Sequence, residues 1–189
     1  SSQLINQHFE VFPPETEEWL QRFRQAWTAE AILGPLEALG RLRALVIGEA
    51  IIDEYFFCDG LGKSSKDPIL AFQYRSTETY AGGSLAVANH LAGFCDHVGL
   101  VTQLGDSRRR EDFVRTALRE NVRARFLTRT GAPTIHKRRF IDTYTSARVF
   151  ELYFMDDSAL AAQDEAALLQ ALAETIGAYD MVVVTDYGH

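Results

Sequence analysis

The sequence predicts an α/β fold with a doubly wound, Rossmann-like and mainly parallel sheet. The first observation is a set of short apolar runs, each followed by turn or acidic residues, at 44–48, 99–101 and 181–184. The second is helical periodicity between these runs, near residues 84–94, 110–121 and 163–176. Strands that alternate with helices in this way are typical of a parallel sheet with helices packed on it.

Four further stretches alternate apolar and polar residues, at 55–59, 69–75, 133–142 and 148–155. In the last of them Phe150, Leu152 and Phe154 face one side, whereas Glu151 and Tyr153 face the other. Alternation with a period of two is typical of strands that have one buried and one exposed face. We therefore expect a second, smaller and half-exposed sheet that is separate from the main one.

The first forty residues differ from the rest, so we predict a helical extension over 1–40 and the main domain over 41–189. Thr16 is a candidate N-cap of a single amphipathic helix that carries Trp19 and Trp27 and ends near the following Gly-Pro pair. A helix with two tryptophans on one face is expected to pack on a partner. It is either a brace on the domain or a connector to an upstream domain.

Composition argues against several classes of protein. The net charge of −7 disfavours general binding to nucleic acid or to anionic membranes, because these surfaces attract a positive surplus. No apolar run reaches the roughly 18 residues of a membrane-spanning helix, and no secretory leader is recognisable. Cys58 and Cys95 have neither zinc-site spacing nor a disulfide framework around them. We expect a cytoplasmic protein without a metal site, a nucleic-acid partner or a membrane partner.

Two segments are candidates for contact with a ligand. Asp53 follows a buried strand, and ligands of open α/β sheets bind beyond the carboxyl ends of the strands. A carboxylate at this place can accept hydrogen bonds from sugar hydroxyls. The alternative is that Asp53 only caps a turn. Gly82 and Gly83 directly precede a helix rich in small residues, and two glycines let the backbone approach a ligand closely. The alternative is an ordinary tight turn.

Two further candidates are charged. Alternation puts Lys137 and Arg139 on one face of their strand, where a pair of cations can bind a phosphate. The alternative is a solvated strand edge that charge protects against aggregation. Asp186 lies just past the apolar run at 181–184, again at the binding edge of the sheet, and a turn residue is the alternative.

In their order along the chain, these segments resemble the ribokinase-like (PfkB-type) carbohydrate kinases, and within them the heptose phosphate kinases. The resemblance covers roughly residues 42–189, with each motif weak alone and the ordered set more specific. The segments that carry it are Gly48-Glu49, where the family has Gly-Asp, then Asp53-Glu54-Tyr55, Gly82-Gly83, the set Pro133, Thr134, Lys137 and Arg139, and Asp186-Tyr187-Gly188.

The resemblance implies an incomplete ribokinase-like fold in which the alternating stretches form a small β-lid over a sugar site. Asp53, Gly82 and Gly83 would then hold sugar hydroxyls, whereas Lys137 and Arg139 would lie near phosphate groups. It further implies ATP and Mg²⁺ as cofactors, with Asp186 on the nucleotide or metal side. The implied partners are a sugar or sugar phosphate, a second copy bound through the lid strands, and the missing C-terminal half of the kinase domain. The catalytic base is expected beyond His189, so this chain alone is expected to be inactive.

Two departures from the family pattern leave an alternative function open. Ala86 stands where the family has an Asn, and Asn89 is the next candidate for that role. The family has an Arg in the last lid strand, and this sequence replaces it near Glu151, which argues against a phosphorylated sugar as the substrate. The leading hypothesis is therefore a sugar or sugar-phosphate kinase, and the alternative is a non-catalytic sugar-binding or oligomerisation module with a kinase-derived fold.

Overall fold

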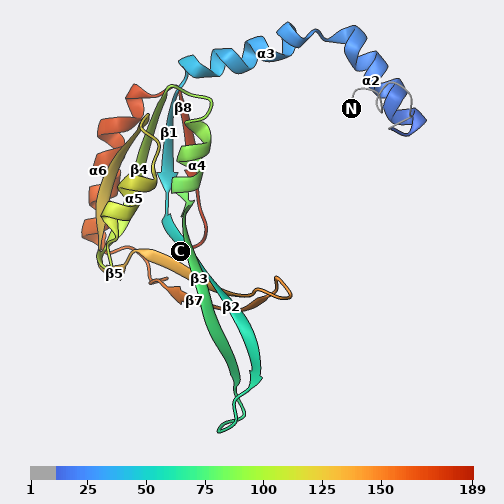
Figure 1. The fold of residues 1–189 in the computed structure, drawn as a ribbon. Helices are drawn as coiled ribbons and strands as arrows, with labels where there is room; N and C mark the ends of the chain where they lie inside the picture. The colour runs from blue at the N-terminus through green and yellow to red at the C-terminus, as the bar shows by residue number, and fades with distance from the viewer. Residues whose placement is uncertain (1–11) are drawn as a thin grey trace. The chain divides into compact units, whose positions relative to one another are not determined.

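A computed structural model describes residues 12–189, and the chain divides into two compact units, residues 1–39 and 40–189 (Figure 1). Each unit is described separately below. None of the helices in the described part of the chain is both long and apolar enough to cross a membrane.

In the first unit, the described residues 12–39 form two helices, α2 (Pro14–Ala26) and α3 (Ala29–Ala38). The expectation of a single helix capped by Thr16 is therefore wrong. Helix α2 begins earlier, at a proline, whose missing N–H group is tolerated in the first turn. The helical run is then interrupted because the Thr28 hydroxyl accepts a hydrogen bond from the Ala31 amide at 3.1 Å and starts α3 as its N-cap.

The second unit is built on a four-stranded parallel sheet, sheet A, with strand order β5-β4-β1-β8. Its strands are β1 (Arg43–Gly48), β4 (His97–Ser107), β5 (Val122–Pro133) and β8 (Met181–Thr185). The three predicted strands are present. The sequence pattern does not predict β5, because Arg123, Arg125 and Arg129 interrupt its apolar residues on this edge strand.

Helices cover both faces of sheet A, as the doubly wound prediction requires (Figure 1). The helices of this unit are α4 (Ser84–Leu91), α5 (Glu111–Ala117) and α6 (Ala162–Thr175), with a short 3₁₀ turn η2 (Ile176–Ala178); a second 3₁₀ turn, η1 (Leu39–Arg41), spans the boundary between the two units. Ala44 and Val46 of β1 pack with Leu85 of α4 on one face. Leu45 of the same strand packs with Ala171 of α6 on the other. Burial of Ala44, Leu45 and Val46 on both faces of β1 explains the unbroken apolar run in the sequence.

The alternating stretches form a second four-stranded sheet, here called the lid sheet, with strand order β3-β2-β6-β7. Its strands are β2 (Ala50–Lys63), β3 (Leu70–Gly83), β6 (Ile135–Asp142) and β7 (Arg148–Phe154). The chain passes from sheet A to the lid sheet at Glu49, between β1 and β2. The β2–β3 hairpin then extends away from sheet A (Figure 1). This confirms the separate small sheet, although β2 and β3 are longer than the pattern predicts.

The two faces of the lid sheet differ in chemistry. The aromatic face carries Phe56, Tyr74, Phe140 and Phe150, whose rings lie in a row. Phe140 stacks on Phe56 at 5.2 Å and on Phe150 at 4.2 Å between ring centroids. Phe150 remains 46% exposed and Tyr74 57% exposed, so this face is only partly covered. The opposite face, here called the polar face, carries Asp53, Arg139 and Glu151.

Candidate functional site

A cavity of about 600 Å³ opens at the carboxyl ends of the strands of sheet A. It is lined by the ends of β1, β4 and β8, by the start of β6 and by residues 157–160 before α6. Its volume lies in the range of small-molecule sites. Its position is the one where ligands bind in open parallel α/β sheets, because the loops that follow the strands gather at this edge.

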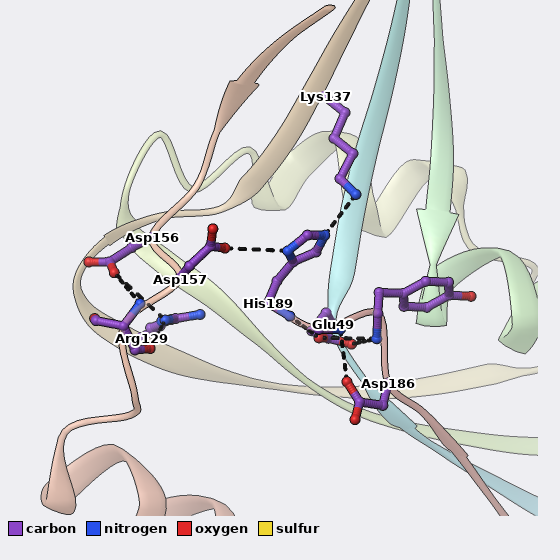
Figure 2. Close-up of polar contacts among 10 residues, drawn as sticks. Glu49, Arg129, Lys137, Asp156, Asp157, Asp186 and His189 are labelled. Carbon is purple, nitrogen blue, oxygen red and sulfur yellow. Dashed lines mark hydrogen bonds and ion pairs between the residues drawn. The ribbon is translucent and has the colours of Figure 1, made fainter.

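Glu49 fixes the turn that follows β8 at the rim of this cavity. Its carboxylate accepts hydrogen bonds from the backbone N–H groups of Tyr187 at 3.0 Å and His189 at 3.1 Å (Figure 2). Asp186 stabilises the same turn by accepting from the Gly188 amide at 2.8 Å. The interpretation of Asp186 as a turn residue therefore holds, and its carboxylate also lies at the cavity.

His189 connects this turn to the lid sheet. Its Nε2 atom lies 2.8 Å from Nζ of Lys137, and its Nδ1 atom lies 3.3 Å from Oδ1 of Asp157 (Figure 2). A lysine ammonium group can only donate, so Nε2 is placed to accept from Lys137 and Nδ1 to donate to Asp157. Lys137 thus contacts a residue that lines the cavity rather than lying along a solvated strand edge.

Asp53 and the glycine pair fit against each other. Asp53 lies within β2 rather than in a turn after β1, and its register partner on β3 is Tyr80. A Cβ atom at Gly82 would overlap the Asp53 carboxylate, so only glycine fits there without a shift. Gly83 has a φ of +57°, and a Cβ there would overlap the Glu49 carbonyl oxygen. The interpretation of Gly82-Gly83 as an ordinary turn is replaced by a close packing requirement.

Arg139 lies between two carboxylates on the polar face. It forms an ion pair with Asp53, and its Nε atom lies 3.2 Å from Oε1 of Glu151. The three side chains are between 15% and 23% exposed. The Tyr153 hydroxyl donates a hydrogen bond to Glu151, and this bond, together with the neighbouring Arg139 and Arg148, lowers the pKa of Glu151. The ionised Glu151 therefore shares Arg139 with Asp53.

A second charged group is buried beneath the aromatic face. Glu54 accepts a hydrogen bond from Nε of Arg138 at 2.6 Å, and Nε2 of His136 lies 3.3 Å from the same carboxylate oxygen. Among the described residues, that Nε2 atom has no aligned hydrogen-bond partner. Burial lowers the pKa of His136, and this effect outweighs the attraction of Glu54. His136 is therefore held in its neutral form.

The structure brings most of the candidate residues together and separates one. Asp53, Gly82 and Arg139 form one cluster. Asp186 lines the cavity, and Lys137 contacts His189, which lines it too. Asn89, expected at the ligand site, instead donates to the Ala117 carbonyl at 2.8 Å and accepts from the Arg119 amide at 2.9 Å. It joins α4 to the end of α5, because its amide satisfies backbone groups left open where α5 ends.

Three residues that lie at the cavity were not selected from the sequence: Glu49, Asp157 and His189. Their partners lie far away in the chain, and Glu49 bonds to residues 138 and 140 positions later. Only Glu49 has a signal in the sequence, since it directly follows a buried strand that ends in glycine. No local pattern marks Asp157 or His189.

Solved structures identify the class of fold. A carbohydrate kinase from Agrobacterium tumefaciens superposes with a TM-score of 0.53 at 19% identity, over 76% of this chain and 45% of that one. Phosphofructokinase-2 from Escherichia coli in complex with fructose-6-phosphate superposes with a TM-score of 0.55 at 14% identity, over 78% of this chain and 47% of that one. The fold is therefore the ribokinase-like fold of carbohydrate kinases, present in part.

Sequence relatives point to one branch of these kinases. The chain is 28% identical to a D-beta-D-heptose 7-phosphate kinase from Bordetella bronchiseptica over 153 residues, which is 81% of this chain and 48% of that protein. It is 27% identical to the bifunctional protein HldE of Rhodopseudomonas palustris over 80% of this chain and 31% of that protein. No protein-family model matches. The chain thus spans about half the length or less of these relatives, and the resemblance to carbohydrate kinases predicted from the motifs is confirmed.

Proposed function

We propose that residues 40–189 form the sugar-binding part of an ATP-dependent carbohydrate kinase. The observation that carries this proposal is the placement of Asp53, held against Gly82 and paired with Arg139, on the polar face of the lid sheet. A carboxylate fixed in this way can accept hydrogen bonds from two sugar hydroxyls without first losing conformational freedom. The kinase relatives and the cavity at the strand ends of sheet A support the same function.

In this proposal the protein mainly positions groups for phosphoryl transfer, since such transfer needs alignment and charge stabilisation more than covalent chemistry. ATP and Mg²⁺ are the implied cofactors. Asp186 offers a carboxylate at the cavity rim, which fits the way Mg²⁺ is held by one or two carboxylates together with phosphate oxygens. Lys137 offers a positive charge near the same cavity. We place the general base in the part of the kinase relatives that this chain does not span.

The aromatic face supports a homodimer formed through the lid strands. Phe140 stacks between Phe56 and Phe150, and the rings of Phe150 and Tyr74 at the ends of the row stay exposed to solvent. Exposed apolar surface of this kind is typical of interaction sites. The same observation favours the second candidate function, a non-catalytic sugar-binding or oligomerisation module. The two candidates differ in whether the assembled protein turns over ATP.

Binding measurements test the shared part of both candidates. Isothermal titration calorimetry of the chain with heptoses and hexoses is expected to show binding that Asp53→Asn weakens by about tenfold or more, since a bond to a charged acceptor contributes roughly 1.5–3 kcal/mol. Asp67→Asn, in the loop between β2 and β3, is the matched control and should bind normally. Equal binding by wild type and Asp53→Asn would contradict the proposed site.

Turnover measurements separate the two candidates. ADP release from ATP is expected when the chain is joined to the C-terminal half of the heptose 7-phosphate kinase relative, and is not expected from the chain alone. Sugar-dependent ADP release by the chain alone, abolished by Asp186→Asn, would show that the catalytic residues lie within these 189 residues. Sugar binding without turnover in the joined protein would favour the binding module.

A further inference from the structure

The cations on the polar face of the lid sheet already have partners. Arg139 is shared by Asp53 and Glu151, and Arg148 lies 3.9 Å from Glu151. Nζ of Lys137 lies 2.8 Å from Nε2 of His189. Two carboxylates around one guanidinium more than balance its single positive charge, so Arg139 offers no net positive charge to an additional anion.

The polar face of the lid sheet carries no net positive charge. The carboxylates are Asp53, Glu78 and Glu151, and the cations are Lys137, Arg139 and Arg148, so three charges of each sign cancel. The cavity at the edge of sheet A is lined by three more carboxylates, those of Glu49, Asp157 and Asp186, and by one guanidinium, that of Arg129, so negative charge is in excess there too. A phosphate monoester carries a charge of about −1.5 to −2 at pH 7 and binds where cations are in excess.

Glu151 is the residue that sets this balance. It is ionised, since the Tyr153 hydroxyl donates to it, and it takes up one side of Arg139. A neutral sugar hydroxyl group, in contrast, can both donate to and accept from side chains of the polar face. The carboxylates of Asp53 and Glu151 can accept from a hydroxyl, and Tyr80 and Tyr55 bring aromatic surface beside them.

We propose that the lid face selects an unphosphorylated sugar, and that Glu151 is the residue that determines this specificity by neutralising Arg139 together with Asp53. This inference rests on the proposed sugar-binding function and deepens it by naming the substrate class. The proposed substrate class differs from the heptose 7-phosphate in the name of the Bordetella relative. The prediction is that charge at position 151, rather than cavity size, decides between a sugar and its phosphate.

Competitive binding to matched sugar pairs tests the inference. The probes are D-mannose with D-mannose 6-phosphate, D-fructose with D-fructose 6-phosphate, and D-glycero-D-manno-heptose with its 7-phosphate, titrated by calorimetry at constant ionic strength. The wild-type chain is expected to bind the neutral member of at least one pair about tenfold or more tightly than the phosphate. Glu151→Arg should shift that ratio toward the phosphate by about tenfold or more, because it frees Arg139 and adds a cation.

Two further variants keep the test decisive. Glu151→Gln removes the charge with little change of shape and should shift the ratio in the same direction, even where the Arg variant fails to fold. Asp67→Arg makes the same change of net charge in the loop between β2 and β3, and should leave the ratio unchanged. A wild-type preference for the phosphate, or Glu151 variants that shift the ratio no more than Asp67→Arg, would overturn the inference alone. Absence of binding to every probe would overturn the proposed function and the inference with it.

Discussion

Substitution of Gly82 by alanine should destabilise the second unit by separating Asp53 from Arg139. The added Cβ would overlap the Asp53 carboxylate and would lie 3.4 Å from the Ile51 carbonyl oxygen, so the carboxylate has to move. Breaking a buried ion pair costs about 3–5 kcal/mol. These side chains are 15–20% exposed, and Glu151 remains as a second partner of Arg139. We therefore expect a loss of about 1–3 kcal/mol, below the range for a fully buried pair.

Thermal unfolding followed by circular dichroism measures this loss, and sugar titration measures its functional effect. For a domain of this size each kcal/mol lowers Tm by about 2–4 °C, so a decrease of about 2–12 °C is expected. Gly60→Ala on β2 is the matched control, because a Cβ there meets its nearest atom, on Phe72, at an ordinary 3.4 Å. A Gly82→Ala protein with the Tm and sugar affinity of Gly60→Ala would refute the reasoning.

Three further predictions concern other parts of the second unit. The pKa of His136 is lower in the folded protein than its usual 6.5, so the unfolded chain binds the proton first and the free energy of unfolding should fall as pH decreases below about 6.5. His136→Phe should flatten this dependence in urea titrations between about pH 7.5 and 5.5, and an unchanged slope would contradict the burial of a neutral imidazole. Glu49→Gln keeps one acceptor oxygen for the turn at Asp186 but loses the negative charge. It should weaken ATP binding by the chain joined to the C-terminal half of the heptose 7-phosphate kinase relative. Unchanged ATP affinity would argue against a role of this turn in nucleotide binding. Phe140→Asp should shift a lid-mediated dimer to monomer in sedimentation velocity, and wild type that is already monomeric at high concentration would contradict dimerisation through this face.

Local pattern was sufficient to predict most elements of the fold. The unbroken run at 44–48 predicts β1 because a central parallel strand is buried on both faces, and the alternation at 148–155 predicts β7 because only one of its faces is covered. The break between α2 and α3 escaped prediction, because it depends on a single side-chain cap at Thr28 within a periodic stretch. Strand β5 escaped because Arg123 and Arg125 interrupt its apolar residues and face solvent on the outer strand of sheet A.

The candidate site, too, could be predicted only in part from the sequence. Asp53, Gly82 and Lys137 could be selected from the sequence because each sits beside a recognisable strand or turn. That Asp53 and Arg139, 86 positions apart, form an ion pair follows only from the parallel pairing of β2 with β6. The role of Glu151 follows from the next pairing, between β6 and β7, which places it opposite Arg139.

The class of fold, the lid sheet and the resemblance to carbohydrate kinases can therefore be predicted from the sequence, since these depend on periodicity and on short motifs in order. Which charges neutralise each other can be seen only in the folded chain. An ion pair depends on distances of a few ångströms between side chains. Strand register sets these distances among residues remote in sequence, as it does for Asp53, Arg139 and Glu151. Asn89 shows the converse, because a residue chosen by its position in a motif is held instead by the backbone of a neighbouring helix end.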